Sequence, residues 1–356
     1  MALNARFSRL PDLADLAPRW CALEARGDAS FFLGWTWTGA WLDSYGVRPE
    51  LLTISDEAEA DVALALMGQG MAGRLLGPAA TLSLGQAVMP QADRAYIEYN
   101  GLLAAHGREA AAADAAIMSI AGRRDWRVLK LCGMQPGSPL LAIPARRRVR
   151  TDVSPVYQID LEDVRGASGD YLSLLSANTR SQIKRAIKDH GGALPSLEAA
   201  APADVTPWLE EMRALNSGRH ADNAWDDPAF GRFVAALVER GRGKGEVELL
   251  RFADAGGTVG LLVNFVYRGV AMNYQSAFAA PRTAKDKPGL LCHAAAVIQY
   301  AGRGLARYSL LAGKDRYKQS LATCEEPLEW WAIERFSPRL EAEAWLRRLL
   351  RRPAAL

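Results

Sequence analysis

The chain has 356 residues, 49% of them hydrophobic and 23% charged, which indicates a folded globular protein with more than one core. The 43 basic residues nearly balance the 40 acidic ones, and the net charge of +3 argues against nucleic-acid binding over the whole surface. A local basic groove is still compatible with it. Four cysteines without a CxxC pair and four histidines without HxH or HExxH predict neither a disulfide framework nor a metal site.

The N-terminus has no basic segment followed by an apolar run, and no stretch has the roughly 18 uninterrupted apolar residues of a membrane helix. We therefore expect a cytoplasmic protein without an integral membrane segment.

The first half predicts an α/β layer. Helical spacing over residues 10–45 places Trp37 and Trp41 one turn apart, which favours core packing over an aromatic ligand platform. Strands are expected at 51–54, 62–67, 96–103 and 127–131, with a helix at 109–121. Residues 68–73 match GxGxxG, but Gly77-Pro78 would break any helix that followed, so a hairpin turn is predicted instead of a dinucleotide site.

The domain boundary is expected near residue 150, which divides the chain into residues 1–150 and 151–356. Four arginines fall in the five positions 146–150. Such a run is typical of a solvated linker, and the alternative is that it lines a cleft between the two halves.

The second half opens with an expected strand at 156–161 and a long helix at 171–189. Arg180, Lys184 and Lys188 recur at i, i+4, i+8 beside an apolar stripe, so they form either a phosphate-binding face or a solvated one. Helices are expected at 205–215 and 228–240, and the polar segment between them, which contains Arg219 and His220, is predicted to face a substrate.

A hairpin at 246–252 and 259–267 and a strand at 269–278 are expected next. The basic loop with Arg282, Lys285 and Lys287 then enters a helix at 290–300 through Pro288-Gly289, which predicts an anion site at the helix N-terminus. A strand at 305–311, a short helix at Tyr317-Lys318 and a strand at 329–336 follow. The arginine-rich tail at 335–352 predicts a solvated amphipathic helix or a peripheral contact with a membrane or partner.

This order of elements resembles the GNAT N-acyltransferase fold, and the second half resembles its CelD/BioF2-like acetyltransferase branch and the related Fem-type aminoacyltransferases. Three motifs carry the resemblance: the helix from Asn178-Thr-Arg180 to Arg185, the helix entry Pro288-Gly289-Leu-Leu, and Gly313 followed by Tyr317-Lys318. The aromatic opening at residues 31–46 is also similar to that branch.

The resemblance implies two GNAT-like lobes of α/β (α+β) class, each a mixed, mostly antiparallel sheet flanked by helices, with a central cleft. It implies acyl transfer from acyl-CoA, as co-substrate, to an amine or hydroxyl of a small-molecule or sugar acceptor, in envelope, exopolysaccharide or secondary metabolism. The residues to which it gives roles fall into three groups. The catalytic group is Lys318, Tyr317 and Tyr274; the donor-binding group is Arg282, Lys285, Lys287, Pro288, Gly289 and Leu290; the acceptor-binding group is Asn178, Arg180, Lys184, Arg219, His220 and Gln275.

Two positions depart from the family pattern: the pyrophosphate loop is reduced to Lys287-Pro288-Gly289, and Ser309 stands where the branch often has an aspartate. Two alternatives therefore stay open, aminoacyl transfer from a charged tRNA and a catalytically silent scaffold. The general base is also open among five residues by side-chain type, namely Glu246, Glu248, His220, Asp222 and Tyr274.

Overall fold

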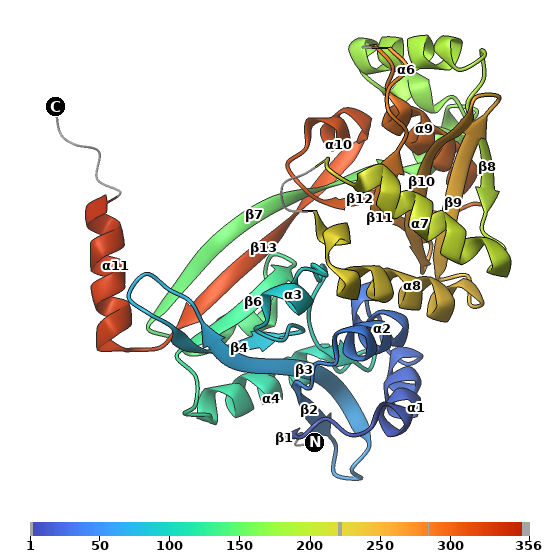
Figure 1. Cartoon of the computed structure of the whole chain (residues 1–356). Helices are drawn as coiled ribbons and strands as arrows, with labels where there is room; N and C mark the ends of the chain where they lie inside the picture. The colour runs from blue at the N-terminus through green and yellow to red at the C-terminus, as the bar shows by residue number, and fades with distance from the viewer. Residues whose placement is uncertain (1–2, 220–222, 284, 351–356) are drawn as a thin grey trace. The chain divides into compact units, whose positions relative to one another are not determined.

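The computed structural model describes residues 3–219, 223–283 and 285–350. The chain forms two compact units, residues 1–153 with 328–356 and residues 154–327. The division falls inside the long strands β7 (Arg147–Asp160) and β13 (Cys324–Glu334) (Figure 1). The sequence assigned all residues after 150 to one lobe, whereas the chain returns to the first unit at Leu328, where β13 pairs with β6 (Val128–Met134).

The sheet of the first unit has the strand order β1-β2-β3-β4-β6-β13, with β5 paired to β3. Its pairs are antiparallel except for β4 with β6. The remaining strands are β1 (Asn4–Ser8), β2 (Glu50–Ser55), β3 (Asp61–Ala72), β4 (Ala79–Leu84) and β5 (Leu103–Ala104). The helices are α1 (Leu13–Glu24), α2 (Trp35–Tyr45), α3 (Pro90–Asp93), α4 (Glu109–Gly122) and α11 (Pro338–Leu350), with 3-10 turns at Phe31–Leu33 and Pro139–Ala142.

Two expectations for the first unit are wrong. The strand predicted at 96–103 is an irregular segment that ends in β5, because Tyr96 and Tyr99 have positive φ angles of 56° and 47°, which a strand excludes. The GxGxxG segment at residues 68–73 is not a turn, because all but its last residue lie within β3, and the chain reverses between the end of β3 and the start of β4. Gly68 is required there by close packing, because a Cβ would lie 1.9 Å from the Gln86 carbonyl oxygen.

The aromatic residues of α2 form core, as predicted. Trp37 and Trp41 are 3% and 4% exposed, and the Trp41 indole donates a hydrogen bond to the Ala92 carbonyl. Trp37 packs edge-on against Phe31 and Phe32. The burial of these rings supplies much of the apolar area that holds α2 to the unit.

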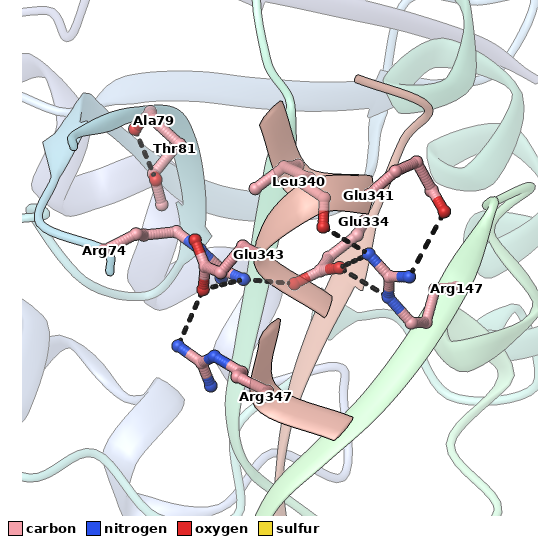
Figure 2. A network of polar contacts seen from close by, with 9 residues as sticks. All are labelled: Arg74, Ala79, Thr81, Arg147, Glu334, Leu340, Glu341, Glu343 and Arg347. Carbon is pink, nitrogen blue, oxygen red and sulfur yellow. Dashed lines mark hydrogen bonds and ion pairs between the residues drawn. The ribbon is translucent and has the colours of Figure 1, made fainter. Parts of the chain in front are cut away.

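The arginine run is not a linker, because it forms the start of β7 and its side chains are paired within the first unit. Arg147 contacts Glu334 at 2.7 Å, and Arg150 contacts Glu329 at 2.9 Å. Figure 2 shows Glu334 between Arg147 and Arg74, with Arg74 also contacting Glu343 of α11 at 3.1 Å. Glu334 and Glu343 are 2% and 1% exposed, so α11 is joined to the unit through buried carboxylates rather than being solvated all round.

The sheet of the second unit has the strand order β7-β12-β11-β10-β9-β8. Only β11 and β12 are parallel. The strands are β8 (Ser196–Ala199), β9 (Val247–Asp254), β10 (Gly257–Tyr267), β11 (Val270–Phe278) and β12 (Arg307–Ala312). The helices are α5 (Leu161–Gly166), α6 (Ala177–Asp189), α7 (Val205–Asn216), α8 (Pro228–Arg242), α9 (Pro288–Gly302) and α10 (Arg316–Leu321), with 3-10 turns at Tyr171–Leu174, Pro202–Asp204 and Ala224–Asp226.

Side chains of β10 alternate between two helical layers, as the pleat of a strand requires. Leu262 belongs to the core that α5, α6 and α9 share with the sheet. Asn264, two residues on, donates to Tyr300 of α9, whereas Phe265 stacks on Tyr274, which also contacts α8. Helices therefore flank both faces.

The helix predicted at 171–189 is wrong in its first third. A 3-10 turn occupies Tyr171–Leu174, Leu175 is extended, and α6 begins after Ser176. The Ser176 hydroxyl accepts a hydrogen bond from the Thr179 amide and caps α6. The helix therefore begins after Ser176 and does not continue from the 3-10 turn.

The fold class is confirmed as a mixed, mostly antiparallel sheet flanked by helices. Among the described residues, no helix combines the length and apolarity that crossing a membrane would need.

Candidate active site

The two parallel strands of the second unit separate after a short paired segment. β11 pairs with β12 only from Val270 with Arg307 to Met272 with Ser309. Each strand carries an extra residue just beyond this segment. Beyond the paired segment, each strand keeps a partner on its other side, β10 for β11 and β7 for β12.

The extra residue of β11 is Tyr274. Val263 of β10 faces Gln275 and Asn264 faces Asn273, so Tyr274 has no partner across the β10–β11 ladder. One inserted residue turns all later side chains of a strand to the opposite face. Phe278 therefore contacts His293 of α9, whereas Tyr274 stacks on Phe265 with ring centroids 4.9 Å apart.

The extra residue of β12 lies between Ser309 and Ala312, where the register with β7 shifts. Leu311 takes a left-handed backbone conformation there with φ 57°, which costs an L-residue roughly 1–2 kcal/mol. The Ser309 hydroxyl accepts a hydrogen bond from the Leu311 amide at 3.1 Å. Ser309 thus stabilises the irregular end of the strand.

A chain of buried hydrogen bonds runs beneath the β11 bulge. Ser276 donates to Asn273, and Asn273 donates to Asn264 at 2.9 Å. Asn264 in turn donates to the Tyr300 hydroxyl, which donates to Glu248 at 2.7 Å. Since each polar group is satisfied, the bulge is rigidly supported, and Glu248 lies at the outer end of the chain.

Two of the predicted acceptor-binding residues meet at the same edge of β11. Gln275 accepts a hydrogen bond from the Trp225 indole at 3.1 Å, and Arg219 donates to the Phe278 carbonyl. Asn216, at the end of α7, donates to the Ser276 carbonyl and ties the preceding helix to this edge. His220 and Asp222 lie outside the described residues.

The predicted Tyr317-Lys318 pair lies at the end of β12, on α10. The Lys318 ammonium donates to the Ala312 carbonyl at 2.9 Å. A Cβ at Gly313 would lie 2.7 Å from Lys318 Nζ, so glycine leaves room for the lysine to fold back over the strand end. Tyr317 stacks over His293 with ring centroids 6.0 Å apart and an interplanar angle of 21°.

The N-terminus of α9 has the local features that the sequence indicated. Pro288 occupies the first turn, and Lys287 is the N-cap residue. Gly289 packs against the ring of Phe278, to which a Cβ would approach within 3.0 Å. Lys285 and Lys287 are exposed, so their charges remain near an end where helix amides favour anions.

Arg282 has a different environment from its two neighbouring lysines. Its guanidinium donates to Asp254 at 2.7 Å, and its amide donates to Asp286 at 2.8 Å. His190, at the end of α6, contacts Asp254 through Nδ1 at 2.6 Å and Asp286 through Nε2 at 3.0 Å. We name these four residues the loop clamp, because they fix the segment before α9 to β9 and α6.

Hydrogen bonding from Arg282, opposed by burial, lowers the pKa of Asp254 to about 2, with help from the Gly256 amide and His190. Both ring nitrogens of His190 lie within hydrogen-bonding distance of carboxylate oxygens, so the ring joins β9 to the segment before α9. The sequence alone did not predict that the four residues of the loop clamp lie together. The only related feature in the sequence was the predicted tight turn after Asp254, which placed that residue at the end of a strand.

The predicted residues of α6 lie apart from this construction. Asn178 and Lys184 are exposed and Arg180 is half-buried, whereas Ile183 on the opposite side is fully buried in the core shared with α9. The basic face of α6 is therefore available to solvent or to a ligand.

His293 was missed by the sequence reasoning. It lies in the apolar run of α9, is fully buried, and contacts the Tyr308 hydroxyl through Nδ1 at 2.9 Å. Burial, with a smaller contribution from the charge of Lys318, lowers its pKa to about 3. The feature of the sequence that could have indicated a buried histidine is its position within a run of leucine and alanine.

One group of three potential metal ligands occurs among the described residues, and it lies in the first unit. Asp28, His106 and Glu109 have ligand atoms within 4.8 Å of one another, and all three are exposed. Asp28 and Glu109 also line a cavity of about 570 Å³ in that unit. Exposed acidic groups of this kind commonly bind nothing, and the expectation of no metal stays a prediction.

The site and fold can be compared with known proteins. Residues 177–319 match the family model described as an acetyltransferase (GNAT) domain. β11, β12 and α9 lie inside the matched range. This part of the chain is thus similar to GNAT-type acetyltransferase domains.

Solved structures extend the likeness to the whole chain. FemX aligns with a TM-score of 0.57 at 8% identity, over 98% of this chain and 100% of its own. L-PGS from Bacillus licheniformis aligns with a TM-score of 0.55 at 9% identity, over 96% and 98%. A conserved protein of unknown function from Bacteroides thetaiotaomicron aligns with a TM-score of 0.55 at 13% identity, over 92% of this chain and 99% of its own.

At such identities the likeness is one of fold. The expected resemblance to GNAT and Fem-type proteins is confirmed at that level. A comparison with curated protein sequences gives no match.

Proposed function

We propose that the chain transfers an acyl group from acyl-CoA to an amine, or a hydroxyl, of a small-molecule acceptor. The observation that carries the proposal is the match of residues 177–319 to a GNAT domain model, because β11 and β12 diverge inside this range and Lys318 lies at the end of β12. In direct transfer, positioning of the two reactants and stabilisation of developing charge supply most of the rate. Two strands that diverge while each stays paired to another strand of the sheet meet the first requirement.

The donor's phosphates are assigned to the start of α9. Lys285 and Lys287 contribute exposed charge, and the first amides of the helix from Pro288 to Leu290 contribute the positive end of its dipole. Arg282 acts differently in this proposal. Because Arg282 forms an ion pair with Asp254, Arg282 stabilises the loop and does not bind a phosphate.

The acyl centre is assigned to the end of β12. Lys318 neutralises the charge that develops on the acyl oxygen, and Tyr317 stands beside it on α10. The acceptor is assigned to the β11 edge near Tyr274, Gln275 and Arg219. Asn178, Arg180 and Lys184 of α6 lie apart from this edge, and their role in acceptor binding stays a prediction from the sequence. A sugar amine of envelope, exopolysaccharide or secondary metabolism fits this polar lining.

A second candidate is aminoacyl transfer from a charged tRNA. The observation that favours it is the exposed basic face of α6, where Lys184 and Lys188 are exposed. The arginine run contributes less than the sequence indicated, since Arg147 and Arg150 are paired with glutamates. Binding that weakens steeply with salt would support this candidate.

The test measures turnover and thermal stabilisation with acetyl-CoA, longer acyl-CoAs and aminoacyl-tRNA, because a ligand stabilises the state it binds. Lys318→Met is expected to lower turnover about 10²–10³-fold without lowering the melting temperature. Lys244→Met, at an exposed lysine of the same unit, is the matched control. Unchanged turnover in Lys318→Met would remove the assigned role, and no response to any donor would favour a scaffold.

A further inference from the structure

His293 is enclosed where the two diverging strands face α9. Its ring contacts Phe278 at the end of β11 and Tyr308 of β12, and Tyr317 of α10 stacks on its face. The side chain has no solvent exposure. A histidine in such a position is fixed in place by aromatic groups from three other elements.

The Nε2 atom of this ring is buried without a hydrogen-bond partner among the residues that the structure describes. Leaving a buried donor or acceptor unsatisfied costs about 1–3 kcal/mol. Native proteins keep such groups rarely, and the explanations for those they keep are strain, a catalytic role, or a bound water or ion.

The hydrogen-bond inventory decides what Nε2 carries. If Nδ1–H donated to Tyr308, the tyrosine proton and the Nε2 lone pair would both lack partners among the described residues. If Tyr308 donates to Nδ1, only Nε2–H is left over. The arrangement in which Tyr308 donates to Nδ1 leaves one polar group unpaired instead of two, so it is favoured, and Nε2 carries the proton and is a donor.

Burial, and to a smaller extent the charge of Lys318, keeps the His293 ring neutral by lowering its pKa. The titratable groups that face it are Tyr308, Tyr317 and Lys318, and the lysine charge opposes a second proton on the ring. Lys318 directly follows Tyr317, which stacks on the His293 ring, and its charge acts on that ring, so a neutral N–H and an ammonium belong to the same region of the unit. Such a pair suits an oxygen that gains negative charge during reaction.

We propose that His293 Nε2–H, together with the Lys318 ammonium, binds the acyl oxygen during transfer. The inference rests on the proposed acyl transfer. The lone pair of the acceptor nitrogen forms the new C–N bond while the carbonyl π electrons move to oxygen. When the intermediate collapses, the C–S bond breaks with its electron pair on sulfur, and the proton lost from nitrogen ends on the thiol.

The decisive variant replaces the donor and its partner together, as His293→Leu with Tyr308→Phe, so that no new buried group is left unpaired. We expect kcat to fall about 10²–10³-fold, with KM changed less than about threefold. The melting temperature should not fall, because an unsatisfied donor has been removed. His293→Gln, whose amide can donate, should recover part of kcat, and His106→Leu at an exposed histidine is the control.

A second readout does not need turnover. The Nε2–H resonance of His293 in ¹⁵N-labelled protein should shift when acyl-CoA is added and not when free coenzyme A is added. An Nδ1–H signal in place of Nε2–H, or an unshifted resonance, would contradict the proposal.

The outcomes separate this proposal from the proposed function. If the wild type transfers acyl groups and Lys318→Met does not, but the double variant keeps its kcat within twofold, His293 has no role at the acyl oxygen. A loss that appears only in KM or in the melting temperature would also refute it. If the wild type transfers no acyl group, both proposals fail.

Discussion

Replacing Asp254 with Asn should destabilise the second unit by removing the charge at the centre of the loop clamp. The carboxylate accepts hydrogen bonds from Arg282, His190 and the Gly256 amide. An asparagine side chain has one oxygen, so an N–H of the amide must face one of these donors. The loop before α9 would then lose a fixed position.

The magnitude follows from the pKa of Asp254, which is lowered from 3.8 to about 2, chiefly by Arg282. At 1.36 kcal/mol per unit this corresponds to about 2 kcal/mol, allowing for the 40% exposure of Arg282. For a unit of this size, about 2 kcal/mol lowers the melting temperature by about 4–8 °C.

The contribution also has a definite pH dependence. A lowered folded-state pKa stabilises above the unfolded value, so the full difference between wild type and Asp254→Asn is expected above about pH 4. It should decline as the pH falls through the folded pKa, with about half left at pH 3.

Urea unfolding of both proteins at pH 7, 4 and 3 measures this difference. Asp163→Asn, at an exposed aspartate of the same unit, should change the free energy of unfolding by less than about 0.5 kcal/mol. Equal stability of wild type and Asp254→Asn at pH 7, or a gap that does not narrow on acidification, would refute the reasoning.

Three further predictions concern single substitutions. Gly289→Ala should weaken acyl-CoA binding and destabilise α9, because its Cβ would lie 3.0 Å from the Phe278 ring. Its control is Gly302→Ala, which has no heavy atom within 4 Å of the new Cβ and should raise the free energy of unfolding by about 0.5–1 kcal/mol; calorimetry measures the binding, and melting curves measure the stability. Gly313→Ala should displace Lys318 and lower kcat more than the melting temperature, and an unchanged kcat would contradict this. Glu343→Gln should destabilise the first unit by about 1–3 kcal/mol in urea unfolding, because a buried carboxylate paired with Arg74 is lost.

Much of the fold was readable from local pattern. The hairpin around Asp254, the entry of α9 at Pro288 and the short helix with Lys318 each depend on residues close together in sequence. Turn chemistry, helix capping and periodic burial act over a few residues, so one sequence suffices to predict them.

The misread elements have a different cause. The arginine run was interpreted as a linker because its partners, Glu329 and Glu334, lie about 180 residues away. The helix expected from 171 to 189 was too long because the Ser176 cap outweighed the continuing apolar pattern. In both cases a specific hydrogen bond overrode a statistical preference.

The amino-acid sequence alone therefore determined the order of elements, the basic loop before α9 and the lysine after Gly313. Only the tertiary structure decided how the strands diverge, because each bulge is defined by its register with a neighbouring strand. It also decided that Arg282 is neutralised by Asp254 and that His293 keeps an unpaired nitrogen. Those properties arise from contacts between distant residues, which local pattern does not specify.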